Sequence, residues 1–427
     1  DSHGPHRRHD GHVRRRGRRL GNVADTPENP DERPDPFSSM FGGMFGGMFG
    51  DMMKMFGGHG PIHWDTARQI AMMTSTGGTP ESNVDPRTRI DFENLARIAA
   101  MHVQAGTGIG DRVDVGEVRP ELVTPGQWAQ RTLDDYRPLF TDLATALGAK
   151  PSDVDGDSDP MGAMFANLTS MLAPMTMGMT VGSMVGLIAK RSLGMYDLPL
   201  PRPSGSRLLL LGDNIDAFAR EWELAVDDVR MWTLVRELVT HQIHGLTHIS
   251  DTVNSLVRAH VAAFEPNPTA LSDRLAGLES SDPSDMMESL QRILGDPELL
   301  LGAVRSPAQD RLRPRLDTIL SVVIGWSDHM TDVIGARILG SPSRIAEAAR
   351  RRRVDGGDET SFVERLLGVH VKRSQVDAGR AFVSGVIERG GEDALSPLYR
   401  SADDLPTPAE LEAPGLWLAR IEYVNGD

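Results

Sequence analysis

Met171–Ala189, part of the longest stretch without a charged residue, limits the possible fold more than any other part of the sequence. It is about as long as a membrane-spanning helix. Gly178, Gly182 and Gly186 recur at every fourth position within it, a spacing that lets two helices approach closely. Proline, threonine and serine lower its hydrophobicity, and basic residues follow only its C-terminal end. We therefore predict a buried helix–helix contact and no membrane span.

The composition excludes several kinds of site and partner. The chain has 427 residues, which fits one large domain or two or three smaller ones. Its formal net charge of −15 argues against a nucleic acid as partner. No cysteine is present, so disulfides, iron–sulfur clusters and thiolate zinc sites are excluded. The basic run Arg350–Arg353 is predicted to be a solvated helix end, where positive charge interacts favourably with the helix dipole.

Two parts of the chain differ strongly in character. Residues 1–58 are basic at first and then rich in Met, Phe and Gly, so we predict a disordered tail that is either an inert linker or a docking segment. No apolar stretch follows the basic start, so we expect no secretory signal and a cytoplasmic protein. Residues 59–427 are predicted to form the folded domain, with parts at 59–160, 161–345 and 346–427.

Hydrophobic periodicity predicts a mainly α-helical fold with a small β-sheet. Arg207–Leu211 lies between Ser-Gly-Ser and Gly-Asp-Asn and is the best candidate strand. Thr124 is expected to cap a helix over Pro125–Leu139, and Asn214 to cap a short helix ending at Trp222. Asp227 is expected to begin a long central helix with an apolar stripe. Further helices are predicted at 91–104, 285–294, 308–339, 343–353, 361–368, 374–389 and 405–410.

Several segments share an order along the chain with a known family. They are Ile62-His-Trp64-Asp65-x-Ala67-Arg68, Pro125-x-x-Trp128, Leu193-Gly194-x-Tyr196-Asp197-Leu198, Asn214-x-x-Ala217-Phe218-Ala219, Val229-Arg230-x-Trp232, Gly379-Arg380-Ala381-Phe382 and Trp417-Leu418-Ala419-Arg420. Together they resemble an actinobacterial zincin-like hydrolase family whose members are commonly labelled zinc-dependent metalloproteases. The resemblance covers roughly residues 60 to 421 and implies a zincin-like, metalloprotease-like fold.

The resemblance also implies where a zinc motif would lie. In His-Glu-x-x-His, the two histidines share one helix face and one zinc, and the Glu is the general base. The family motif places its first His on Arg236, its Glu on Glu237 and its second His on Thr240. A later helix that would supply a third ligand places that ligand on Ile324. Only Glu237, as a vestigial general base, keeps its residue type, so the motif is degenerate.

These replacements argue against zinc at the inherited positions. Arginine has no lone pair to offer a metal. At about 4 Å and an effective dielectric near 20, two unit charges interact by roughly 4 kcal/mol, and a dication feels about twice that repulsion from arginine. A full set of structural ligands binds zinc with about 10–16 kcal/mol. With most ligands replaced and that repulsion added, we predict that no metal is held there.

A relocated metal site is the competing interpretation. Glu237, His241, His244 and His248 follow one another at steps of four, three and four and would share one helical stripe. The three histidines could then bind zinc with Glu237 as base. Against this, Gly245 interrupts the segment and favours an end of the helix there.

Two functional hypotheses follow. In the first, the chain is a non-catalytic scaffold, a pseudoenzyme that acts through contact with a protein partner, for example a catalytically intact zincin-like relative. In the second, it is an active zinc-dependent hydrolase or peptidase with the relocated site at His241, His244 and His248. Some members of the family are labelled with a role in deazaflavin coenzyme biosynthesis, but no Gly-rich phosphate loop in this sequence supports such a role.

Overall fold

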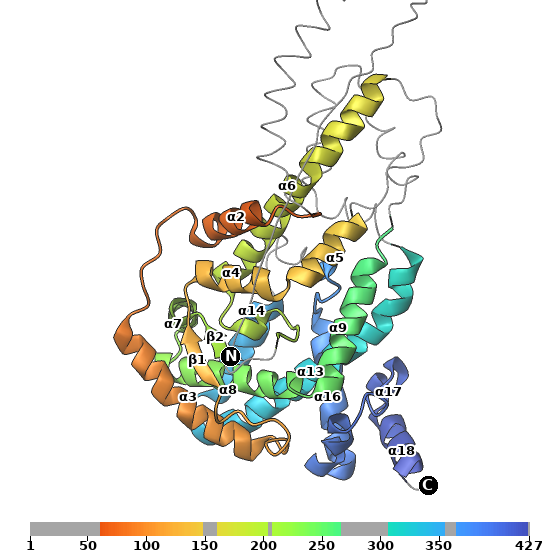
Figure 1. The fold of residues 1–427 in the computed structure, drawn as a ribbon. Coiled ribbons are helices and arrows are strands. Elements are labelled where there is room, and N and C mark those ends of the chain that lie inside the picture. The colour runs from red at the N-terminus through yellow and green to blue at the C-terminus, as the bar shows by residue number, and fades with distance from the viewer. Residues whose placement is uncertain (1–59, 148–159, 204–206, 266–305, 355–363, 426–427) are drawn as a thin grey trace, which may run out of the picture. The chain divides into compact units, whose positions relative to one another are not determined.

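Helices make up most of the described chain in the computed structural model, and one small sheet lies among them (Figure 1). The structure describes residues 60–147, 160–203, 207–265, 306–354 and 364–425. These residues lie within a unit that begins at Gly58. The predicted tail at 1–58 and the predicted helix at 285–294 lie outside the described residues. The division of the chain into domains stays a prediction.

The order of elements follows the mainly helical expectation, which is confirmed. The elements are α2 (Trp64–Thr76), α3 (Pro86–Gly106), β1 (Arg119–Leu122), α4 (Pro125–Asp135), α5 (Arg137–Leu147), α6 (Pro160–Arg191), η1 (Met195–Asp197), β2 (Arg207–Leu210), α7 (Gly212–Glu221), α8 (Val226–His244), α9 (Thr247–Ala262), α13 (Pro307–Ile338), α14 (Pro342–Val354), α16 (Arg373–Gly390), η2 (Glu392–Tyr399), α17 (Pro408–Glu412) and α18 (Pro414–Asn425).

The sheet of the described region has two parallel strands, β1 and β2. The predicted strand at 207–211 is confirmed as β2, and Leu122 pairs with Leu210 at its end. β1 was not predicted, because Pro120 cannot donate to a ladder and polar residues surround it. An isolated bridge joins Gly194 to Leu210, so the segment before η1 is attached to the same sheet.

The glycines of α6 pack against α2, as the sequence predicted. A Cβ atom at Gly178 would lie 2.5 Å from the His63 carbonyl oxygen, and one at Gly182 would lie 2.4 Å from that of Ala67. The two helices therefore touch backbone to backbone along this face. Within the described residues, none of the helices combines the length and apolar character that a membrane crossing requires.

Two predicted helices differ from the structure. The helix expected over 125–139 is divided into α4 and α5, because Tyr136 leaves helical geometry with φ −100° and ψ 17°. Its cap is as predicted, with the Thr124 hydroxyl accepting from the backbone N–H of Gln127. Asn214 does not cap α7. It lies inside the helix, and its amide donates to the carbonyl oxygens of Ala189 and Ser192 at the end of α6.

The central helix α8 lies at the heart of the described fold, in contact with α3, α7 and α13 (Figure 1). It begins at Val226, one residue before the predicted start, and nearly all of its side chains after the first turn are buried. α13 in turn packs against α16 at a close crossing. A Cβ atom at Gly379 would lie 1.9 Å from the Ser321 carbonyl oxygen, so the backbones are in direct contact there.

The close crossing of α13 and α16 leads to a prediction about stability. Replacing Gly379→Ala should lower the free energy of unfolding by about 1–3 kcal/mol, because overpacking forces α13 and α16 apart. Urea denaturation followed by circular dichroism measures the change. Gly415→Ala is the matched control, since the nearest atom to its Cβ would be the Arg389 Nε at 3.5 Å. A Gly379→Ala chain as stable as the Gly415→Ala chain would contradict the described crossing.

Candidate functional site

Glu237 lies in the middle of α8 with a fully buried side chain. Its Oε2 accepts a hydrogen bond from the backbone N–H of Tyr196 at 2.9 Å, and its Oε1 accepts one from Arg236 Nη1 at 2.8 Å. A Cβ atom at Gly194 would lie 2.3 Å from the Glu237 Cδ, so only glycine lets the chain pass this carboxylate. Both oxygens of Glu237 are therefore engaged by the protein itself.

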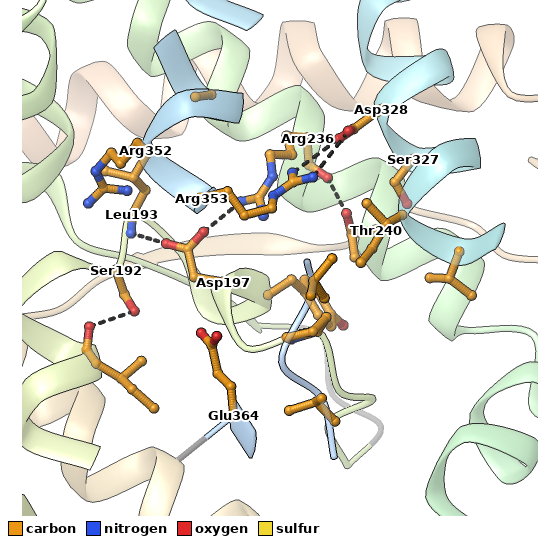
Figure 2. Close-up of a pocket in the computed structure, with 18 of the residues that line it drawn as sticks. Ser192, Leu193, Asp197, Arg236, Thr240, Ser327, Asp328, Arg352, Arg353 and Glu364 are labelled. Carbon is orange, nitrogen blue, oxygen red and sulfur yellow. Dashed lines mark hydrogen bonds and ion pairs between the residues drawn. The ribbon is translucent and has the colours of Figure 1, made fainter. Parts of the chain in front are cut away.

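Arg236 joins this carboxylate to a second one. The same Nη1 donates to Asp197 Oδ1 at 2.9 Å, as Figure 2 shows. The other oxygen of Asp197 accepts from the backbone N–H of Leu193. The guanidinium thus lies between two acids, one on α8 and one in η1. A buried charge must be paired in this way to be tolerated.

The charges of Arg236, Glu237 and Asp197 shift one another's pKa values. Burial raises the pKa of Glu237 to about 7, although Arg236 acts in the opposite direction. Burial acts to raise the pKa of Asp197, but Arg236, Arg352, the Leu193 N–H and Arg191 together hold that pKa below its usual value. The pKa of Arg236 lies above its usual value, because Asp197 and Glu237 outweigh the effect of burial. Arg236 is therefore a permanent cation at this position.

The three positions that the resemblance assigns to metal ligands meet at one pocket. Arg236 and Thr240 reach it from α8, and Ile324 reaches it from α13. The Thr240 hydroxyl donates to the Arg236 carbonyl oxygen at 2.8 Å, within its own helix. The structure therefore brings these positions together, as the placement of the motif required.

These residues do not fit a zinc ion. Zinc in proteins is held by imidazole nitrogens, thiolates or carboxylates. At the inherited positions, Arg236 presents a cation, Ile324 a hydrocarbon, and Thr240 a hydroxyl bonded to its own helix. The remaining carboxylate, Glu237, already accepts two hydrogen bonds. We therefore derive no reaction step through a metal from this arrangement.

The histidines of the relocated site are not assembled. α8 ends at His244, and His248 lies in the next helix, where its Nε2 donates to the Leu398 carbonyl oxygen at 2.9 Å. His241 Nδ1 lies 2.8 Å from the Tyr196 hydroxyl. In the part of the chain that the structure describes, no group of three or more His, Asp or Glu is placed to hold a metal. The prediction that one helical stripe carries all three histidines is wrong, because Gly245 divides it.

Sequence reasoning missed the second acid and the cations of the pocket. Asp197 belongs to a segment that carried the resemblance, but its pairing with Arg236 depends on the fold. Arg353 was predicted to be solvated, yet it forms two 3.1 Å hydrogen bonds with Asp328 (Figure 2). Arg352 also faces the pocket, with its guanidinium 5.3 Å from the Phe218 ring. The solvated-end interpretation is therefore wrong for these two arginines.

Comparisons with known proteins agree with this architecture. Residues 62–418 match a family described as zincin-like metallopeptidase. The crystal structure of a protein from Chloroflexus aurantiacus, described as a candidate hydrolase with a novel fold, is similar with a TM-score of 0.58. The two chains are 20% identical, and the match covers 84% of this chain and 99% of the other, so it shows the fold alone. No curated protein is significantly similar to this chain.

His244 makes a pH prediction. Burial lowers its pKa from 6.5 to about 3, with a further contribution from His241. The unfolded chain binds this proton more readily, so the contribution to stability is full above pH 6.5 and is lost as pH falls toward 3. At 1.36 kcal/mol per pKa unit, the loss between pH 7 and pH 5 is about 2 kcal/mol.

Replacing His244→Phe should remove this loss, because the ring is kept and the titration is not. Urea unfolding at pH 7 and pH 5 measures it. The raised pKa of Glu237 makes the free energy of unfolding change with pH in the opposite direction. Glu237 is present in both chains, so its effect cancels when the wild type and the His244→Phe chain are compared. Thr233→Val on the same helix controls for general destabilisation and should keep the wild-type slope. An unchanged slope in the His244→Phe chain would contradict the prediction.

Proposed function

Because this chain belongs to the zincin-like metallopeptidase family, we propose that it is a non-catalytic member in which an internal ion pair replaces the zinc ion. One observation carries the proposal, namely that Arg236, which the resemblance places at the first ligand position, bonds both Asp197 and Glu237. The motif is degenerate in this interpretation, and the chain is a pseudoenzyme.

The chemistry of the family explains why this pairing matters. In an intact motif, the Glu activates a water molecule that zinc has already polarised. Glu237 is fully buried and its two oxygens accept from Tyr196 and Arg236, so the carboxylate is not exposed to a water molecule from which it could take a proton. Freeing it would break a buried ion pair, and loss of one partner costs about 3–5 kcal/mol. The residue is therefore better suited to holding the fold than to catalysis.

The proposed role is that of a scaffold that binds a protein partner in the cytoplasm. A catalytically intact zincin-like relative is the partner that best fits a chain with the family fold and without the metal ligands. The Met/Phe/Gly-rich segment at 40–50, which lies outside the described residues, is the candidate docking element. The net charge of −15 is unfavourable for nucleic acid.

The alternative function is an active zinc hydrolase with His241, His244 and His248 as ligands and Glu237 as base. One observation favours it, since both ring nitrogens of His244 are buried without a hydrogen-bond partner. It requires His241 to release Tyr196 and His248 to release Leu398. It also requires the α8–α9 junction to rearrange around Gly245. The proposal of a lost metal site needs no such change.

Zinc content tests the proposal directly. The full chain, purified from zinc-supplemented medium, is expected to hold well under one zinc per chain by plasma mass spectrometry. The triple change Arg236→His, Thr240→His and Ile324→Glu should restore about one zinc per chain, because it supplies two imidazoles and a carboxylate. Arg230→His, on the same helix but paired with Asp216, is the control and should bind none.

One zinc per wild-type chain that disappears in the His244→Ala chain would overturn the proposal in favour of the relocated site. Circular dichroism on each variant separates loss of metal from loss of fold. A triple variant that folds and still binds no zinc would contradict the placement of the motif.

The partner hypothesis has its own test. Full-length protein, mixed with a relative that retains His-Glu-x-x-His, is expected to elute as a larger complex in size-exclusion chromatography with light scattering. A chain lacking residues 1–58 should lose most of this association if the tail is the docking element. Elution of the two full-length proteins as separate species at micromolar concentration would exclude that partner.

A further inference from the structure

The pocket beside Arg236 is large enough for a small organic molecule. The cavity measures about 70 Å³, taken as space for the centres of water-sized molecules. One water needs about 10–15 Å³ on this measure, so the cavity has room for several waters or for a small organic molecule of similar size. Its walls come from the end of α6, η1, α8, α13, α14 and the chain around Val369. Several distant parts of the fold therefore converge on one space.

Three of the four arginines that line the pocket form ion pairs with acids that also line it. The pairs are Arg191 with Glu364 at 3.3 Å, Arg236 with Asp197 at 2.9 Å, and Arg353 with Asp328 at 3.1 Å. Arg352 makes no hydrogen bond or ion pair with any described residue, and no dashed line reaches it in Figure 2. Its guanidinium lies over the Phe218 ring, 5.3 Å from the ring centroid.

The environment of Arg352 is unfavourable for an unpaired charge. Burial lowers its pKa, and Arg191 and Arg236 act in the same direction, while Asp197 partly opposes them. An arginine guanidinium carries a planar set of N–H donors that matches the two oxygens of a carboxylate or phosphate. An anion bound here would therefore be paired with the one cation of the pocket that has no carboxylate of its own among the described residues.

His244 is a second pocket residue whose polar atoms lack a hydrogen-bond partner in the described structure. Its side chain lines the pocket, the residue is 6% exposed, and both ring nitrogens lack a hydrogen-bond partner. The His244 ring stacks on the Tyr196 ring with the two centroids 5.3 Å apart, and this stacking holds the orientation of the imidazole. Leaving a buried polar group unsatisfied costs about 1–3 kcal/mol. A polar group on a ligand would supply the missing hydrogen bond.

The remaining wall of the pocket is apolar and therefore favours a ligand that also has an apolar part. Val323 and Ile324 of α13 line the pocket together with Val369 and Val371. Ile324 and Val371 belong to a small hydrophobic cluster separate from the main core. An inorganic anion would leave this surface without contact. The occupant that fits both halves is an anion attached to an apolar body.

We propose that this pocket binds a small organic oxyanion, a carboxylate or a phosphate on an apolar group, with Arg352 as the contact to the anion and His244 as a contact to a polar group. The proposal extends the proposed function, because the ligand occupies the place where a working family member would hold metal and substrate. It does not depend on the protein partner.

Titration of the full-length protein with four probes tests the site by isothermal calorimetry. Hexanoate and hexyl phosphate present the two oxyanions on one apolar chain, hexanol lacks the charge, and inorganic phosphate lacks the chain. One or both of the hexyl anions should bind, and the stronger of the two identifies the anion source. Hexanol and inorganic phosphate should bind at least about tenfold more weakly.

The residues are tested with matched variants. Arg352→Gln should weaken the better hexyl anion by about tenfold or more, since a hydrogen bond to a charged group contributes roughly 1.5–3 kcal/mol. His244→Phe should weaken it by a smaller factor. Arg351→Gln is the control, because the neighbouring arginine is exposed and paired with Glu347, and it should bind like the wild type.

Three outcomes would overturn the proposal. They are no binding of either hexyl anion at millimolar concentration, equal binding of inorganic phosphate, and a folded Arg352→Gln chain with wild-type affinity. Circular dichroism confirms that each variant is folded. The zinc content of the wild-type chain is measured without any probe, so failure of the ligand site and failure of the proposed loss of zinc are distinguishable.

Discussion

The ion pair of Arg236 with Glu237 and Asp197 is the interaction on which the centre of this fold depends. It joins α8 to the segment 193–197, which also bonds to β2 and to the indole of Trp128. Both acids also accept hydrogen bonds from backbone N–H groups, so the carboxylates are held by the main chain as well as by the arginine. A cation at this point is then required, since two buried carboxylates without one would repel each other.

Under the proposed function, the same requirement explains why an arginine suits a position that the resemblance assigns to a metal ligand. A histidine lost from a zinc site would leave a buried Glu without its metal and without a counter-charge. Arg236 supplies that charge internally, and it is shared between Glu237 and Asp197. Under the proposed loss of the zinc site, the ion pair supplies the positive charge beside the buried acid of α8 that a metal would otherwise supply. It does so without a group that polarises water.

The sequence predicted what depends on local pattern and missed what depends on distant contacts. The glycine spacing of α6, the apolar run of β2 and the limits of α8 are local, and each agrees with the structure within a few residues. The break at Tyr136 and the pairing of β1 depend on neighbours far along the chain. At the site, Arg236, Thr240 and Ile324 were placed through the resemblance, whereas Asp197 could not be, because residues 39 positions apart form its ion pair with Arg236. The sequence of the run Arg350–Arg353 does not show whether its side chains are solvated or buried. That depends on where α14 packs, and the structure places Arg353 of this helix against Asp328.

The polar character of the pocket follows from the same reasoning. A fold that needed only stability would gain by replacing an unsatisfied imidazole or an unpaired guanidinium with apolar side chains of similar size. His244 and Arg352 instead face one space from two different helices, each with bonding capacity that no described residue uses. Arg191, Arg236 and Arg353 are each paired with an acid of the fold, whereas Arg352 is not. A bound anion satisfies both residues at once and turns a cost to the empty fold into a stabilising contact, so recognition of a ligand accounts for both features together.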